Sequence, residues 1–296
     1  MAPLERRVSP ALEPDVNAAL AYLNGQWLPL SEARVSVLDR GFLFADGAYE
    51  VLATYDGRLL GETEHLARLE RSLGELKIRN PHSRAEWQAI FARLIREAGG
   101  GDLAVYLQVT RGAASGRSHA FPENITPTVV AYCSPLPSPS AQARAQGVAA
   151  ITVPDPRWAR CDIKSTSLLA NVLLTQQAKE AGANEAILHR DGRVTEGSSS
   201  NVFIVQRGAV LTTPDSVEIL PGITRNLLAQ LRADGIDVIA RGFSLDELRA
   251  ADEIWITSTT REVLAVTTLD GKPIGNGNPG KIYARAYQLF QGLKRR

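Results

Sequence analysis

One lysine stands where the chain changes from polar to apolar residues. In "RWARCDIKSTSLLANVLL" (Arg157–Leu174), Lys164 lies between a segment with Trp158 and Cys161 and a run of small and apolar residues. A buried lysine costs free energy unless its charge is paired or its amine becomes neutral. A lysine kept partly neutral is a good nucleophile, and its commonest use is a Schiff base with a carbonyl. The alternative, which this segment alone favours, is a lysine with a buried stem and a solvated tip.

A carboxylate among hydroxyl groups follows in "VTEGSSSN" (Val194–Asn201). Glu196 lies there among small hydroxyl residues, between two predicted strands. A carboxylate in such a place can keep a pyridine nitrogen protonated, which makes the ring an electron sink. The serines would then donate hydrogen bonds to phosphate or substrate oxygens. The alternative is an ordinary polar turn, because serine-rich turns are common.

A candidate phosphate site follows in "LPGITRNLLAQL", where Gly222, Ile223 and Thr224 open a predicted helix. The first backbone N–H groups of a helix have no partner within it, and the helix dipole is positive at that end. Such a helix start suits a phosphate, although most helix starts bind only water. The run "TSTT" (residues 257–260) ends a predicted strand, and its hydroxyls could supply further phosphate donors.

The elements that position these residues are a mixture of hairpins and helices. Apolar stretches joined by Asn24-Gly25, Asp56-Gly57 and Asp191-Gly192 predict β-hairpins. Because hairpins imply antiparallel pairing and strict βαβ alternation is missing, we expect an α+β fold with mainly antiparallel sheets. Helices are predicted from the one-sided leucines Leu66/Leu69/Leu73/Leu76 and from capping boxes at Ser83/Glu86 and Ser244/Glu247. Two further helices are predicted, over 168–181 and between Gly222 and Gly235.

A proline-rich stretch, "SPLPSPSAQ" (Ser134–Gln142), is the best candidate for a linker, since its prolines interrupt helix and strand alike. The predicted organisation is a flexible N-terminal extension (1–20), a small domain (21–133), the linker (134–142) and a C-terminal domain (143–296). A long polar loop, from Arg111 to Thr126, interrupts the small domain, and loops of this length are more often functional than idle.

The composition excludes several classes of protein. The chain has 296 residues, 44% hydrophobic and 22% charged, so it can bury a large core. A net charge of +1 gives no case for nucleic acid or an anionic membrane, and no apolar run approaches the roughly 20 residues of a membrane span. Two cysteines and a start without a secretory signal lead us to expect a cytoplasmic protein. We expect no metal site.

One glycine motif is misleading. Gly275, Gly277 and Gly280 fit the G-x-G-x-x-G pattern. A dinucleotide site needs a βαβ unit and an acidic residue about 20 positions further on, whereas this chain ends at Arg296. We therefore expect a loop before a terminal amphipathic helix.

Several motifs, taken in order, closely resemble the fold type IV aminotransferases that depend on pyridoxal 5'-phosphate, in the branched-chain aminotransferase superfamily. The motifs are "DRGFLFADGAYEV", "EHLARL", "RCDIKS", "EAILHRDGRVTEGSSSNVF", "GITR" and "TSTT". Within that superfamily the resemblance is to the D-amino-acid aminotransferases, and it extends from about Ala21 through nearly the whole chain. It implies a smaller N-terminal α/β domain and a larger C-terminal pseudo-barrel domain.

The resemblance also implies roles for single residues. Lys164 would carry the cofactor as a Schiff base and move the proton between the substrate Cα and the cofactor. Glu196 would face the pyridine nitrogen, and Leu220 would press on the ring. Without the resemblance, Arg68 would be taken for a solvated arginine at the flank of a leucine face. The remaining cofactor-binding residues would be Arg68, Gly222, Ile223, Thr224 and Thr259 around the phosphate, with Ser199, Ser200 and Ser258 close by.

The substrate would be selected by the long loop, "RGAASGRSHAFPEN", which contains Arg117 and His119. An arginine fork suits a carboxylate, and a nearby histidine adds a donor, although a solvated basic loop is the plainer interpretation. In the D-amino-acid enzymes such a pair takes the substrate α-carboxylate, helped by a tyrosine that corresponds to Tyr49. The family also implies a homodimer in which this loop reaches the neighbouring subunit's site.

The activity expected from the resemblance is a ping-pong transamination from a D-amino acid to a 2-oxo acid, such as 2-oxoglutarate or pyruvate. Glu50, His65 and Arg157 match family positions without an assigned step. A branched-chain L-amino-acid transaminase, an (R)-amine transaminase and an aminodeoxychorismate lyase share the lysine, the carboxylate and the phosphate groups. A protein that only stores or senses the cofactor is an alternative from another class.

Overall fold

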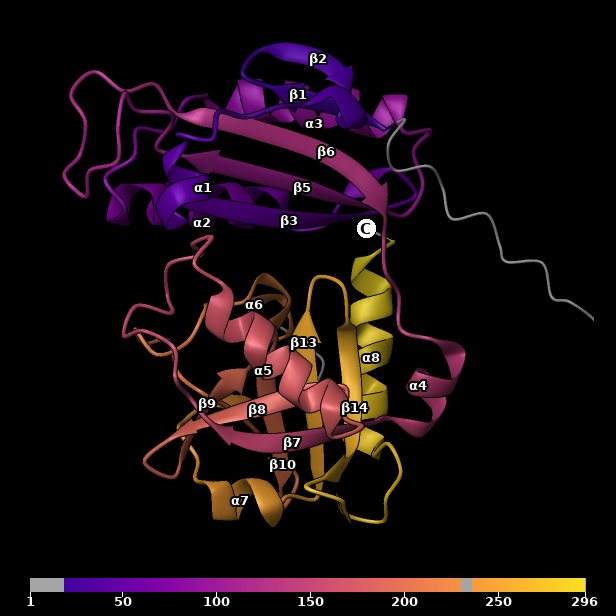
Figure 1. The fold of residues 1–296 in the computed structure, drawn as a ribbon. Coiled ribbons are helices and arrows are strands. Elements are labelled where there is room, and N and C mark those ends of the chain that lie inside the picture. Colours follow the sequence, from indigo (N-terminus) through magenta and orange to yellow (C-terminus); the bar gives the residue numbers. More distant parts are fainter. Residues whose placement is uncertain (1–18, 230–235, 296) are drawn as a thin grey trace, which may run out of the picture.

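The computed structural model describes residues 19–229 and 236–295 and has two halves, one above the other in Figure 1. The predicted N-terminal extension lies outside the described residues as far as residue 18, and so do residues 230–235, which include the end of the helix predicted between Gly222 and Gly235. Each half is built on one sheet, and helices cover both sheets. The chain is α+β, as the sequence predicts.

The first half contains an antiparallel sheet with the order β2-β1-β6-β5-β3-β4. The predicted hairpin at Asn24-Gly25 is confirmed, since Leu23 pairs with Gln26 across the turn. The strands are β1 (Leu20–Leu23), β2 (Gln26–Pro29), β3 (Gly47–Tyr55), β4 (Arg58–Leu59), β5 (Leu103–Thr110) and β6 (Thr128–Pro135).

Helices close the core of the first half. Leu66, Leu69 and Leu73 are buried on one face of α2, as their spacing predicts, while Leu76 follows the end of the helix. The capping box of Ser83 and Glu86 is confirmed at the start of α3. The helices are η2 (Leu30–Glu32), α1 (Arg40–Phe44), α2 (Glu62–Glu75) and α3 (Arg84–Glu97).

The second half contains a larger sheet with the order β12-β11-β10-β13-β14-β7-β8-β9, and β15 pairs with β14. It is strongly curled, so that β7 and β8 run across β13 and β14 in Figure 1. Its strands are β7 (Val148–Pro154), β8 (Glu185–Arg190), β9 (Arg193–Gly197), β10 (Asn201–Gln206), β11 (Ala209–Thr212), β12 (Val238–Ala240), β13 (Glu253–Ser258), β14 (Glu262–Leu269) and β15 (Lys272–Pro273).

Pairing in the second sheet is mainly antiparallel, as expected, but β7 pairs in parallel with both β14 and β8, and β11 with β12. Parallel neighbours need a crossover connection. Helix α5 (Leu169–Glu180) supplies it between β7 and β8, and the segment from Arg157 to Leu168 leads into it. This crossover carries Lys164 from the curled sheet toward the other half.

The remaining helices belong to the second half and to its connection with the first. β6 runs on to Pro135 and α4 begins at Ala141, so the proline-rich stretch without regular structure is 136–140. The capping box of Ser244 and Glu247 is confirmed at α7. The glycine motif lies in the loop before α8, whose C-terminal end lies beside the first half (Figure 1). These helices are α4 (Ala141–Gln146), α6 (Ile223–Ala229), α7 (Leu245–Arg249) and α8 (Lys281–Leu293).

Each half has its own hydrophobic core. Trp87 and Phe91 are almost fully buried under the first sheet, and Phe203 and Trp255 are equally buried in the second half. Burying such side chains supplies the dominant favourable term of folding. Among the described residues, none of the helices combines the length and the apolar character that a membrane crossing requires.

Candidate active site

A cavity of about 800 Å³ is lined by residues of both halves of the molecule. Every candidate site residue except Arg117 and His119 lines it. These lining candidates are Tyr49, Arg68, Lys164, Glu196, Ser199, Ser200, Leu220, Gly222, Ile223, Thr224, Ser258 and Thr259. The fold thus brings together residues that are far apart in the sequence.

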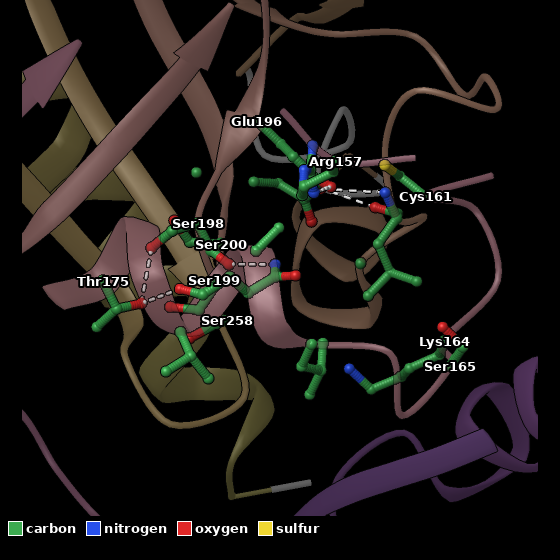
Figure 2. A pocket seen from close by; sticks show the side chains of 18 of the residues that line it. Arg157, Cys161, Lys164, Ser165, Thr175, Glu196, Ser198, Ser199, Ser200 and Ser258 are labelled. Carbon is green, nitrogen blue, oxygen red and sulfur yellow. Dashed lines mark hydrogen bonds and ion pairs between the residues drawn. The ribbon is translucent and has the colours of Figure 1, made fainter. Parts of the chain in front are cut away.

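Lys164 is half-buried and its side chain reaches into this cavity (Figure 2). Its Nζ lies 4.2 Å from the centre of the Tyr49 ring. The Tyr49 N–H donates to the Lys164 carbonyl over 3.0 Å, and the Lys164 N–H donates to Ser72 Oγ over 3.2 Å. The amine-bearing residue is therefore fixed at its backbone while its tip is directed into the cavity.

Glu196 lies opposite, near the end of β9, and is 4% exposed. One carboxylate oxygen accepts from Arg157 over 2.5 Å. The other oxygen accepts from Asn201 Nδ2 over 3.0 Å and from the Leu220 N–H over 3.1 Å. Figure 2 shows the Arg157–Glu196 pair on one side of the cavity and Lys164 on another. The carboxylate is oriented by three donors.

Glu196 nevertheless lacks a cation of its own. The Arg157 guanidinium is also forked onto Asp155, with its Nε and Nη2 each 2.9 Å from a carboxylate oxygen. Burial raises the pKa of Glu196 to about 7, and the hydrogen bond and charge of Arg157 offset this only in part. The pKa of Asp155 is lowered instead, because the contacts of Arg157 outweigh its burial. This cluster would be more stable with a further positive charge beside Glu196.

Arg68 forms a different buried pair on the side of the first half. Its Nε and Nη2 donate to the two oxygens of Glu50, each over 2.8 Å, and its Nη1 donates to the Pro221 carbonyl over 2.9 Å. His65 Nδ1 lies 2.7 Å from Glu50. Burial alone would raise the pKa of Glu50, but Arg68 and then His65 hold it well below its usual range. Glu50 is thus an orienting group that fixes Arg68 at the cavity wall.

The start of α6 forms another part of the wall. Ile223 and Thr224 are its first residues, and the N–H groups of a first helical turn have no partner within the helix. Gly222 is required there, because a Cβ on it would lie 1.8 Å from Asn201 Oδ1. Nearby, the buried Thr257 Oγ1 finds no hydrogen-bond partner within the described residues. This wall offers donors to an anion.

The serine turn after β9 divides into buried and open hydroxyls. Ser200 Oγ donates to Glu185 over 2.6 Å, and Ser198 donates to the same carboxylate through its N–H and its hydroxyl. Arg261 also binds Glu185. Ser199 is exposed and lines the cavity. Of the three serines, Ser199 has the hydroxyl best placed to meet a ligand.

The loop from Arg111 to Thr126 does not bring Arg117 and His119 to the cavity of their own chain. Both are exposed and lie beside Phe44, with the Arg117 guanidinium 5.0 Å and the His119 ring 5.3 Å from its centroid. The buried Arg40 holds the loop by donating to the carbonyls of residues 118–120. The loop is ordered but is directed elsewhere.

Sequence reasoning missed four residues that shape the site: Ser72, Asp155, Glu185 and Asn201. Asn201 is the clearest case, since its Nδ2 donates both to Glu196 and to the Leu220 carbonyl over 2.8 Å. A polar amide that opens the apolar strand "NVFIV" was a usable signal. Ser72 gave none, because a serine on a leucine-rich helix is ordinary without its partner.

Three features of the cavity fit pyridoxal phosphate. The lysine amine faces an open space, the buried carboxylate of Glu196 lacks a full countercharge, and the wall at α6 and Thr257 offers donors for an anion. A pyridinium nitrogen supplies a positive charge and a phosphate supplies acceptors. Among the described residues, no group of three His, Cys, Asp or Glu side chains is placed to hold a metal ion.

The family model described as amino-transferase class IV matches residues 47–269. Similar proteins include the D-alanine aminotransferase of Bacillus licheniformis, 45% identical over 90% of this chain and 94% of the relative. The D-alanine aminotransferase of Staphylococcus aureus strain MW2 is 40% identical over 91% of this chain and 96% of the relative.

Solved structures have the same fold. The branched-chain amino acid aminotransferase of Escherichia coli superposes with a TM-score of 0.89 at 25% identity, covering 93% of this chain and 94% of the other. The T.th. branched-chain amino acid aminotransferase, solved with pyridoxamine 5'-phosphate, has a TM-score of 0.87 at 26% identity, covering 95% of this chain and 96% of the other.

Proposed function

The chain belongs to the class IV aminotransferases, and from that premise we propose that its amino donors are D-amino acids and its acceptors 2-oxo acids. It is a transaminase that depends on pyridoxal 5'-phosphate, with the fold of the type IV enzymes. The observation that carries the proposal is the Lys164 amine directed into the cavity that Glu196, a buried carboxylate whose pKa is raised, also lines. Relatives named D-alanine aminotransferase support the choice of substrate.

The residues around the cavity would hold the cofactor at three points. Lys164 would bind it covalently, Glu196 would face its ring nitrogen, and Leu220 would pack on the ring. Its phosphate would be bound by Arg68, Gly222, Ile223, Thr224, Ser258 and Thr259, with Ser199 close by and Ser200 turned to Glu185. When bound, pyridoxal phosphate supplies a carbonyl carbon for the amino group and a ring that accepts electrons from the Cα–H bond.

The protein supplies the proton transfers. Lys164 Nζ would remove the proton from the substrate Cα and deliver it to the former carbonyl carbon of the cofactor. Glu196 can hold or release a proton at its carboxylate near neutral pH, because its pKa is about 7. Tyr49, beneath the Lys164 amine, restricts where that amine can move. Each step uses a group that already lines the cavity.

We further propose that recognition of the substrate α-carboxylate is shared between two copies of the chain. Arg117 and His119 lie outside their own chain's cavity, and apolar side chains such as Phe42, Leu169 and Val172 are exposed, at 71%, 74% and 61%. Exposed apolar surface of this kind is typical of a protein interface. A homodimer would place the loop at the other copy's site, where Tyr49 would help. The buried free cysteines Cys133 and Cys161 support a reducing, cytoplasmic location.

The direct test is replacement of Lys164 by alanine. We expect turnover of D-alanine with 2-oxoglutarate to fall by about 10⁴-fold or more, because both the covalent and the proton-transfer roles are lost. Pyruvate formation measures it, and Lys281→Ala, at the exposed start of α8, is the matched control. Unchanged turnover in Lys164→Ala would refute the assignment.

A comparison of D-alanine with L-leucine, each with 2-oxoglutarate and with glutamate formation as the common readout, tests the branched-chain alternative. Faster reaction with L-leucine would assign the chain to the branched-chain group and leave the cofactor assignment intact. A visible absorbance band that no amino acid changes would instead favour a protein that only carries the cofactor.

A further inference from the structure

Lys164 lies in the chain of the second half, yet its backbone is bound by the first half. Ser72 of α2 accepts its N–H and Tyr49 of β3 donates to its carbonyl. Two residues later the Thr166 N–H donates to the Gly47 carbonyl over 2.9 Å, and its hydroxyl donates to the Ala45 carbonyl over 2.8 Å. The segment that carries the lysine is therefore docked on the first half.

A charged cluster, here called the latch, adds contacts between the lysine segment and the first half on the N-terminal side of Lys164. It consists of Arg71 and Glu75 on α2 and of Arg160 and Asp162 on the lysine segment. Arg71 donates to the Asp162 carboxylate over 3.2 Å and also to the Asp162 carbonyl. Arg160 donates to Asp162 over 3.0 and 3.1 Å and to Glu75 over 2.7 Å. Asp162 therefore accepts from both halves of the molecule.

The latch and Arg68 lie on the same helix. Arg71 and Ser72 follow Arg68 by three and four residues, and Glu75 follows them by four and three. Residues at these spacings are neighbours on one face of a helix. Arg68 holds Glu50 and the Pro221 carbonyl at the opposite end of that row. One rigid helix therefore connects the group at the proposed phosphate end of the cavity with the segment that carries the amine.

We propose that Arg71 and Asp162 are positioning residues that set where the Lys164 amine stands in the cavity. This proposal depends on the proposed function only for the purpose of that position, which is transamination by the Lys164 amine. The competing explanation is an ordinary surface ion pair, since the side chains of Arg71 and Arg160 are 38% exposed, and such pairs contribute little. The Asp162 side chain is only 14% exposed, and Arg71 binds its backbone as well as its carboxylate.

The decisive experiment measures the reactivity of the lysine without relying on turnover. The full chain, freed of cofactor, is treated with formaldehyde and cyanoborohydride, and methylation of Lys164 is compared by peptide mass spectrometry with methylation of Lys179. Both lysines line the cavity. In Asp162→Asn the ratio of Lys164 methylation to Lys179 methylation should rise about threefold or more, because a released lysine segment exposes the Lys164 amine. Arg71→Met should do the same from the other half, which covers the case that one variant fails to fold.

Turnover of the loaded enzyme gives a second readout. A misplaced catalytic group costs rate more than binding, so Asp162→Asn should lower kcat about tenfold or more and leave KM within about twofold. Asp162→Glu keeps the carboxylate and should recover most of both effects. The control is Arg241→Met, which removes the exposed pair with Glu247 far from the lysine segment and should leave the labelling ratio unchanged.

A labelling ratio in Asp162→Asn and Arg71→Met equal to that of the unchanged protein overturns the proposal, whatever happens to kcat. A changed ratio in a protein that shows no transamination would leave the latch standing and refute the proposed function instead. The two conclusions are thus tested separately.

Discussion

Glu50 and Glu196 are two buried carboxylates of one molecule with opposite electrostatics. Both are removed from solvent, at 0% and 4% exposure, and both contact an arginine. Arg68 gives Glu50 two hydrogen bonds and His65 adds a third contact, so its pKa stays below the usual range. Arg157 gives Glu196 a single hydrogen bond and directs its fork to Asp155, so the pKa of Glu196 rises to about 7.

The difference shows that the presence of an arginine does not decide the charge of a buried carboxylate. The two sites differ in whether the arginine is shared with a second carboxylate and in the added contact of His65 with Glu50. On the first half, an exclusive partner makes Glu50 a fixed anion that orients Arg68. On the second half, a shared partner leaves Glu196 able to take up a proton near neutral pH, which suits a group that faces a ring nitrogen.

The largest expected effect on the free energy of unfolding comes from breaking the buried Glu50–Arg68 pair. Glu50→Gln leaves the Arg68 guanidinium, 7% exposed, without its anion. Removing one partner of a buried ion pair typically costs about 3–5 kcal/mol, so the free energy of unfolding should fall by that amount. Urea unfolding of the cofactor-free protein measures it. Glu97→Gln is the matched control at the exposed Arg96–Glu97 pair, where the expected change is below about 0.5 kcal/mol.

If the free energy of unfolding falls no more in Glu50→Gln than in Glu97→Gln, the pairing of Glu50 with Arg68 does not stabilise the protein. The contrast drawn between Glu50 and Glu196 would then be wrong for Glu50.

The next effect sharpens the comparison through pH. Because the folded protein keeps Glu196 protonated up to about pH 7 and the unfolded chain only up to its usual 4.5, the fold binds the extra proton between these values. That contribution to stability is complete below pH 4.5 and is lost as the pH rises through 7, a change of about 3 kcal/mol. The free energy of unfolding is measured for the cofactor-free protein and for Glu196→Gln at several pH values. As the pH rises from 4.5 through 7, the unchanged protein should lose stability relative to the glutamine variant.

If the difference between the unchanged protein and Glu196→Gln instead stays flat from pH 4.5 to 7, and the unchanged protein loses relative stability only below pH 4.5, then Arg157 holds Glu196 as an anion.

The smallest effect concerns the neutral donor that helps to orient Glu196. Asn201→Ala removes the hydrogen bonds to the buried Glu196 carboxylate and to the part-buried Leu220 carbonyl. We expect a loss of about 1–2 kcal/mol in the free energy of unfolding. The pKa of Glu196 should also rise further, since a donor to its charged form is lost. A pH titration of unfolding that matches the unchanged protein would contradict this role.

Local features of the fold were predictable from the sequence. The hairpin at Asn24-Gly25, the capping boxes at Ser83 and Ser244, and the leucine face of α2 all depend on residues within a few positions of one another. Periodicity and turn chemistry act over such short distances. The parallel pairs beside β7 are set by crossovers and by the curl of the whole sheet, so turn signals could not reveal them.

The residue types that line the candidate site could be predicted from the sequence, but the contacts among them could not. Lys164, Glu196 and the start of α6 each carry a local signal, whereas Arg68 was found only through family resemblance. Its partners, Glu50 and the Pro221 carbonyl, come from β3 and from the other half of the molecule. Such contacts are created by tertiary packing, and no spacing within one helix encodes them.

The stretch 136–140 joins the two sheets, and Pro137, Ser138 and Ser140 in it are exposed. A protease that nicks the chain there would leave two fragments still joined through Lys164's backbone contacts and the latch. The nicked protein should therefore migrate as one species on a sizing column and separate into two fragments only in denaturant.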